Sequence, residues 1–144
     1  MSTTTRLLPA LTLLTLLGCA TSNSSRENTS PRALDGSRYQ VHIEPDAAAK
    51  AQGESAFDDW LIFDNGRMSS SVCEGYGFKS TPYSVDAASS GWSFETSQHA
   101  DGAGDTHWQG TIRGKEIEGQ MQVTHPGKPT AHTSFHGTRG RSNN

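Results

Sequence analysis

The stretch THWQGTIRGKEIEGQMQVTH, residues 106–125, alternates apolar or small residues with polar ones on both sides of a Gly-Lys pair. An alternation with a period of two is typical of a strand with one buried and one solvated face. The residues that share the apolar face are Trp108, Gly110, Ile112, Ile117, Gly119, Met121 and Val123. Because Gly114-Lys115 separates two such runs, the stretch predicts a β-hairpin.

The same alternation recurs through most of the chain, in RYQVHIE (38–44), WLIFDNGRMSSSV (60–72), TPYSVDA (81–87), WSFETSQ (92–98) and AHTSFHGT (131–138). Asn65-Gly66 is a strong hairpin-turn pair because both positions tolerate a positive φ. A meander of about eight such strands covers its apolar faces and its edges by closing on itself. The pattern therefore predicts an all-β, antiparallel up-and-down barrel, with an open sandwich as the alternative. The connection at 45–55 predicts a turn of helix over one end.

Three glycines, Gly110, Gly119 and Gly137, fall on the inward face, where a small barrel needs room or strong bending. The inward positions also carry a set of aromatic residues: Tyr39, Phe63, Trp92, Phe94, Trp108 and Phe135. A barrel of about eight strands has an interior just large enough for side chains or for one small ligand. The aromatic set therefore either lines a site for a small apolar or amphipathic ligand or fills the core.

The N-terminal stretch LTLLTLLGCATSNSS, residues 11–25, follows one basic residue, Arg6, and ends an apolar run on small residues. This layout is typical of a secretory signal, and the run is shorter than the roughly 20 apolar residues of a spanning helix. The residues Leu16-Leu17-Gly18-Cys19 resemble a bacterial lipobox. The resemblance implies that Cys19 carries a diacylglycerol and becomes the first residue after cleavage. An ordinary cleaved signal without lipid is the alternative.

These features predict four segments: a signal peptide at 1–18, a lipidated, disordered tether at 19–33, a β-barrel domain at 34–138 and a disordered tail at 139–144. Residues 20–33 are rich in Ser, Thr and Asn and hold too few apolar residues to form a core. The residue after Cys19 is Ala20 rather than Asp. In a Gram-negative bacterium the resemblance then implies the outer membrane, facing the periplasm.

Three motifs, LDGSRYQV (34–41), HWQGTIRGKEIEGQM (107–121) and TSFHGT (133–138), resemble the opening strand, the closing hairpin and the last strand of lipocalin-like barrels. The resemblance implies a lipocalin-like barrel of a group whose members mostly have no assigned function. Small lipid-anchored barrels that block lysozyme are a fainter resemblance. They imply the alternative function, a protein-interaction lipoprotein such as an inhibitor of a cell-envelope enzyme.

Residues that could act in catalysis or bind a metal are present, but they do not form a recognisable motif. His132 and His136 share a face about 13 Å apart, too far for one ion, although His125 could approach one of them. Asp58-Asp59 and the pair Asp101 and Asp105 could suggest paired carboxylates or a Ca²⁺ site. Residues 101–105 lack the ligand count of a calcium loop, so a solvated turn is expected there. No nucleophile elbow is present. We therefore expect no enzyme, no metal, no cofactor and no residue assignable to ligand binding.

After Cys19, Cys73 is the only other cysteine, so no intramolecular disulfide is expected, and we predict that its thiol is buried or half-buried. It begins the segment CEGYGFKSTPY (73–83), which either lines the mouth of the barrel or plugs one end of the core. The chain has a net charge of −3, and this mild acidity argues against a nucleic-acid partner. The expected partners are a membrane, through the anchor, and a small apolar ligand or an envelope protein.

Overall fold

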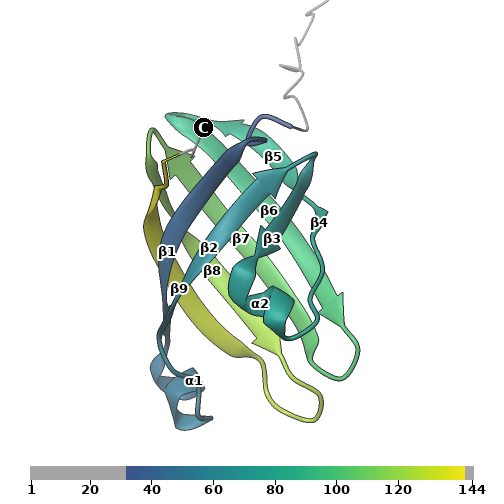
Figure 1. The fold of residues 1–144 in the computed structure, drawn as a ribbon. Coiled ribbons are helices and arrows are strands. Elements are labelled where there is room, and N and C mark those ends of the chain that lie inside the picture. The colour runs from purple at the N-terminus through teal and green to yellow at the C-terminus, as the bar shows by residue number, and fades with distance from the viewer. Residues whose placement is uncertain (1–31, 142–144) are drawn as a thin grey trace, which may run out of the picture.

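A computed structural model describes residues 32–141, and these residues form a nearly closed antiparallel barrel (Figure 1). Its strands are β1 (Ser37–Pro45), β2 (Phe57–Asp64), β3 (Arg67–Ser70), β4 (Thr81–Pro82), β5 (Ser84–Ala88), β6 (Gly91–Ala100), β7 (Gly104–Arg113), β8 (Glu116–Thr124) and β9 (Ala131–Arg139). The sheet order β4-β3-β2-β1-β9-β8-β7-β6-β5 confirms the predicted up-and-down barrel. The predicted signal peptide, Cys19 and most of the tether lie outside the described residues.

The two hairpins that the sequence marks most clearly are confirmed. β7 and β8 pair around Gly114-Lys115 in the register Ile112↔Ile117. In the β2–β3 turn, Asn65 has φ 51° and Gly66 has φ 70°, as a two-residue hairpin turn requires. The short helix expected at 45–55 is also present, as α1 (Ala47–Ala51), and the carboxylate of Asp46 caps it by accepting the Ala49 N–H at 2.7 Å.

The described part of the chain has nine strands rather than about eight, because the run 81–87 is interrupted. Tyr83 separates β4, which pairs with β3, from β5, which pairs with β6. Pro82 has no N–H to donate to a neighbouring strand. Its carbonyl accepts a hydrogen bond from the Thr96 hydroxyl at 2.8 Å. This side-chain bond joins β4 to β6 and brings the barrel close to closure.

Two glycines leave room for aromatic rings on the inner face of the barrel. The register places Phe94, Gly110, Gly119 and Phe135 side by side on β6, β7, β8 and β9. A Cβ on Gly110 would lie 2.6 Å from the Phe94 ring, and a Cβ on Gly119 would lie 2.6 Å from the Phe135 ring. The glycines therefore provide the room that the sequence pattern predicted.

Because the strands run up and down, alternate connections gather at opposite ends of the barrel (Figure 1). The entry end, defined here as residues 32–36, the turns 65–66, 89–90 and 114–115, and residues 139–141, includes the first described residue. Here the Asp35 carboxylate accepts the Gly66 N–H and the Tyr83 hydroxyl, both at 2.9 Å. Arg139 N–H donates to the Lys115 carbonyl at 2.7 Å, so this residue of the predicted tail completes β9.

The helical end, defined as α1, α2 (Ser71–Gly75) with residues 76–80, the turn 101–103 and the loop 125–130, closes the other side. Cys73 and Phe78 are buried here, with 7% and 4% of their surfaces exposed, whereas Tyr76 is 71% exposed. The burial of Cys73 confirms the expectation for its thiol. Phe78 and Tyr83 belong to the core, as the plug interpretation of segment 73–83 expects, and Tyr76 projects outward.

Candidate functional site

The inside of the barrel is packed with aromatic side chains. The Phe63 ring from β2 lies 5.0 Å from the Phe94 ring of β6, centroid to centroid, and 5.2 Å from Tyr83. Both pairs are edge-to-face contacts, an arrangement that aromatic rings favour. Since β2 and β6 are not neighbours in the sheet, these contacts span the interior. Trp92 is the exception in the predicted inward set, because it is only half-buried, at the entry end.

Polar groups inside the barrel are hydrogen-bonded to one another. The Gln98 Oε1 atom accepts from the Trp108 indole at 3.1 Å and from the Thr106 hydroxyl at 3.2 Å. The Gln98 amide nitrogen donates to the Lys79 carbonyl at 3.0 Å. These bonds pair Gln98 with other groups of the chain, as is usual for buried polar side chains.

A buried carboxylate holds α2 on the barrel. Asp59 is 3% exposed and accepts from Trp60 N–H at 2.7 Å, from Val72 N–H at 3.0 Å and from the Ser70 hydroxyl. Asp58 and Asp59, a possible pair of carboxylates in the sequence, lie on opposite faces of β2. Strand alternation turns Asp58 outward and Asp59 inward, and burial raises the pKa of the Asp59 carboxyl.

The thiol of Cys73 lies beside this carboxylate. Burial raises the pKa of Cys73 to about 11, so the thiol is protonated at neutral pH. The thiolate is the reactive form of cysteine. This environment therefore does not produce a nucleophile.

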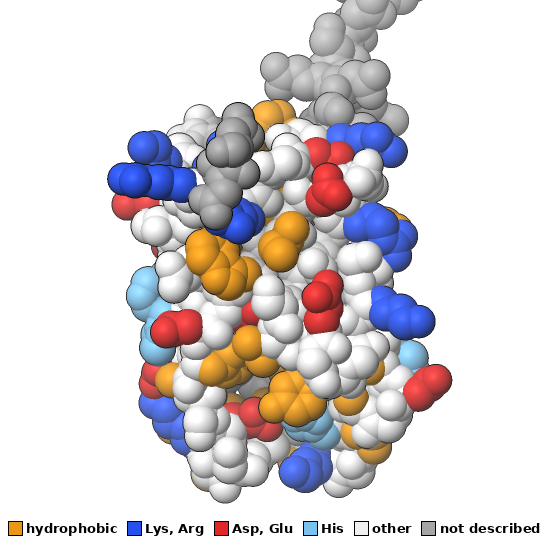
Figure 2. Space-filling model, in the orientation of Figure 1, with side chains coloured by type: hydrophobic (Ala, Val, Ile, Leu, Met, Phe, Trp, Pro, Cys, Tyr) orange, Lys and Arg blue, Asp and Glu red, His pale blue; other side chains and the backbone are white. Residues whose placement is uncertain are grey.

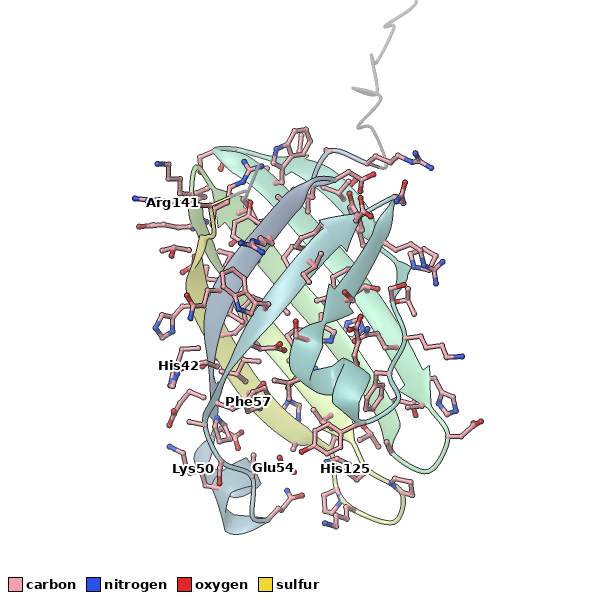
Figure 3. The ribbon with its side chains drawn as sticks, in the orientation of Figure 1. His42, Lys50, Glu54, Phe57, His125 and Arg141 are labelled. Atoms are coloured by element: carbon pink, nitrogen blue, oxygen red, sulfur yellow. The ribbon has the colours of Figure 1, made fainter. Side chains whose placement is uncertain are left out.

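Several histidines near the helical end lie on the surface, each beside one or two acidic side chains. His42 lies 2.8 Å from Asp58, and His99 lies 2.8 Å from Asp105. These hydrogen bonds raise the pKa of both imidazoles. Figure 3 shows His125 near Glu54, and their side chains are 3.3 Å apart. Across residues 32–141 no group of three His, Cys, Asp or Glu side chains is placed to hold a metal ion.

A shallow polar groove of about 690 Å³ runs along the outside of β5–β9. Its floor is backbone at Gly110 and Gly119, and its walls carry amides, hydroxyls and carboxylates that include Gln109, Gln120 and Glu95. Glu95 is already paired with His107 at 3.2 Å. The groove suits water and polar groups, and it offers no aromatic or aliphatic anchor on its outward positions.

Exposed apolar side chains form separate patches on a different wall, the one that carries β2 and α2 (Figure 2). Ile62 is 36% exposed and Tyr76 is 71% exposed, the two large apolar residues described as exposed. Trp60, two residues from Ile62 on the same outward face, is half-buried, and the Arg38 guanidinium lies 4.9 Å from its ring centroid. We call the surface formed by Trp60, Ile62, Val72 and Tyr76 the β2–α2 face.

Sequence alternation alone placed Trp60 and Ile62 outward, but the exposure of Tyr76 depends on how residues 71–80 fold. No protein-family model, curated protein or solved structure matches the chain. Within residues 32–141, none of the helices has the length and apolar character needed to cross a membrane.

Proposed function

We propose that this chain is a non-enzymatic lipoprotein of the cell envelope, tethered through Cys19, whose barrel binds a protein partner at the β2–α2 face. The exposed Tyr76 after α2, on the same wall of the barrel as the outward Trp60 and Ile62 of β2, is the observation that carries the proposal. Tryptophan, tyrosine and arginine are the residues that most often dominate the energy of protein interfaces. Arg38, stacked on Trp60, adds the third of these residue types.

The two other candidate sites, the barrel interior and the groove on β5–β9, are less suited to binding a partner or ligand. A small apolar ligand inside the barrel would have to displace the Phe63–Phe94 contact, which joins strands that are not neighbours. The groove on β5–β9 lacks the apolar centre that protein interfaces bury. The β2–α2 face, by contrast, exposes two large apolar side chains, Ile62 and Tyr76, beside charged ones. Asp58 and Asp64 lie on outward positions of the same strand.

The partner is tested by placing a photo-crosslinking amino acid at position 62 or 76 in cells that make the full chain. Position 120, in the groove, is the matched control. We expect one discrete adduct from 62 and 76 and none from 120. Replacing Tyr76 by alanine together with Ile62 by serine should reduce capture of that partner at least about tenfold, since loss of a hot-spot pair costs more than about 1.4 kcal/mol.

Both substitutions lie on the surface, so the melting temperature should change little, and a matching melt excludes misfolding as the cause. The proposal is overturned by equal adducts from position 120. It is also overturned if the double variant retains full capture at an unchanged melting temperature.

The anchor is tested separately, by the intact mass of protein purified from its native membrane. We expect a chain that begins at Cys19 and carries acyl chains, because a single acyl chain holds a protein only marginally and two or more hold it stably. A chain that begins elsewhere and carries no lipid would refute the anchor and leave the proposal for the β2–α2 face intact.

A further inference from the structure

Positive charge is concentrated at the entry end of the barrel. The Lys and Arg residues at or near this end are Arg32, Arg38, Arg67, Arg113, Lys115, Arg139 and Arg141. Those at or near the helical end are Lys50, Lys79 and Lys128. Figure 2 shows Lys and Arg side chains gathered around the upper end of the molecule in that view. The positive charge is therefore distributed unevenly along the barrel axis, with most of it at the entry end.

Acidic residues are divided almost evenly between the two ends, so the helical end, with few Lys and Arg, is net acidic. Near the helical end they include Glu44, Asp46, Glu54, Glu74, Asp101 and Asp105. Several of these pair with histidines rather than with Lys or Arg, as Asp105 does with His99. At the entry end the Asp35 carboxylate accepts from Gly66 and Tyr83. The exposed acidic residues near this end are Asp64, Asp86, Glu116 and Glu118.

Four of the basic residues form one continuous border, which we call the basic rim: Arg113, Lys115, Arg139 and Arg141. The Arg139 N–H donates to the Lys115 carbonyl, and the Arg38 guanidinium donates to the Arg141 carbonyl at 2.9 Å. All four side chains of the rim are exposed. Arg113 pairs with Glu118 at 2.7 Å, so Lys115, Arg139 and Arg141 present most of the positive charge.

The chain between Cys19 and the barrel joins the barrel at the same end. Arg32, the first described residue, lies at the entry end, and residues 19–31 precede it. At no more than about 3.5 Å per residue, such a segment reaches at most about 45 Å. An anchor on Cys19 therefore keeps the entry end within about 45 Å of the bilayer surface.

We propose that the basic rim docks on the anionic headgroups of the anchoring bilayer and holds the barrel with its entry end toward the membrane. Basic side chains close to a membrane surface are attracted by anionic lipid, within about a Debye length. The acidic helical end then points away from the bilayer, and the β2–α2 face lies on the side of the barrel. This proposal rests on the proposed anchoring through Cys19.

The test uses the chain from Cys19 to Asn144, which retains the whole described barrel, coupled through Cys19 to a maleimide lipid in vesicles. The buried Cys73 thiol does not compete for the maleimide. Amine labelling of Lys115 reports on the entry end, and labelling of Lys128 reports on the helical end. We expect Lys115 to label at least about fivefold more slowly on phosphatidylglycerol-containing vesicles than on phosphatidylcholine vesicles, and Lys128 to label equally on both.

High salt should remove the protection of Lys115, because it shortens the Debye length to about 3 Å at 1 M. Arg139→Glu with Arg141→Glu should also remove it. Lys50→Glu with Lys79→Glu, which changes the net charge equally at the helical end, should not. Equal labelling of Lys115 on both vesicles, or protection of Lys128 instead, would overturn the proposal.

The maleimide lipid supplies the anchor whether or not cells acylate Cys19. Protection of Lys115 on these vesicles therefore tests the basic rim alone. The intact mass of the native protein tests the anchor alone, so failure of one can be distinguished from failure of the other.

Discussion

Replacing Gly119 by alanine is expected to lower the free energy of unfolding of the barrel by about 3 kcal/mol, at the upper end of the usual cost of overpacking. A Cβ at this position would lie 2.1 Å from the Gln109 carbonyl oxygen and 2.6 Å from the Gly110 Cα. Both are backbone atoms of the neighbouring strand, so β7 and β8 would have to separate. Urea or thermal unfolding measures the change, and the melting temperature should fall by about 10 °C or more.

Gly75→Ala is the matched control, because a Cβ there meets no atom within 4 Å. Gly110→Ala distinguishes a clash with a side chain from a clash with the backbone. Its nearest contacts are atoms of the Phe94 ring at 2.6 Å and 2.8 Å. A smaller side chain at 94 should recover part of the Gly110→Ala loss, whereas a smaller side chain at 135 should not rescue Gly119→Ala. An unchanged melting temperature for Gly119→Ala would show that the two strands do not need this close contact.

Sequence alone predicted the strands and two of their turns, because those features depend on neighbours in the chain. Asn65-Gly66 and Gly114-Lys115 determine their hairpins locally. The break at Tyr83 could not be predicted in this way, since TPYSVDA alternates without interruption. It depends on Asp35, which accepts the Tyr83 hydroxyl from 48 residues away, and on the Gly66 carbonyl, which accepts the Tyr83 N–H at 3.3 Å.

The surfaces show the same division between local and long-range causes. Alternation along β2 predicts that Trp60 and Ile62 face outward, but the place of Tyr76 on the same wall depends on how α2 packs against β2. The basic rim joins residues as far apart as Arg113 and Arg141. An up-and-down order places alternate turns at the same end, so this gathering follows from the topology once the number and limits of the strands are known.

Asp59→Ala is expected to destabilise the barrel by about 2–4 kcal/mol, because it leaves buried donors without an acceptor. Those donors are the N–H groups of Trp60 and Val72 and the hydroxyl of Ser70. Since Val72 belongs to α2, the loss should fall first on the contact between α2 and β2. Reaction of Cys73 with a thiol reagent reports this local opening, and we expect it to be much faster in Asp59→Ala than in the native chain.

Asp59→Asn is the matched control, since the amide oxygen can still accept from the two N–H groups. A comparison of this variant with the native chain also isolates the effect of ionising Asp59 on stability. The pKa of Asp59 is raised by burial, so the folded state favours the protonated carboxyl more than the unfolded state does. The native chain should therefore lose stability as the pH rises from about 4 through this raised pKa, and then level off.

Asp59→Asn cannot ionise at this position and should lack that decrease. Unfolding curves for both chains from pH 4 to pH 8 give the comparison, and the difference in unfolding free energy should move in favour of the variant as the pH rises. Parallel profiles would mean that the carboxyl titrates alike in the folded and unfolded states. Slow labelling of Cys73 in Asp59→Ala, at a matched global stability, would mean that α2 is held by contacts other than this carboxylate.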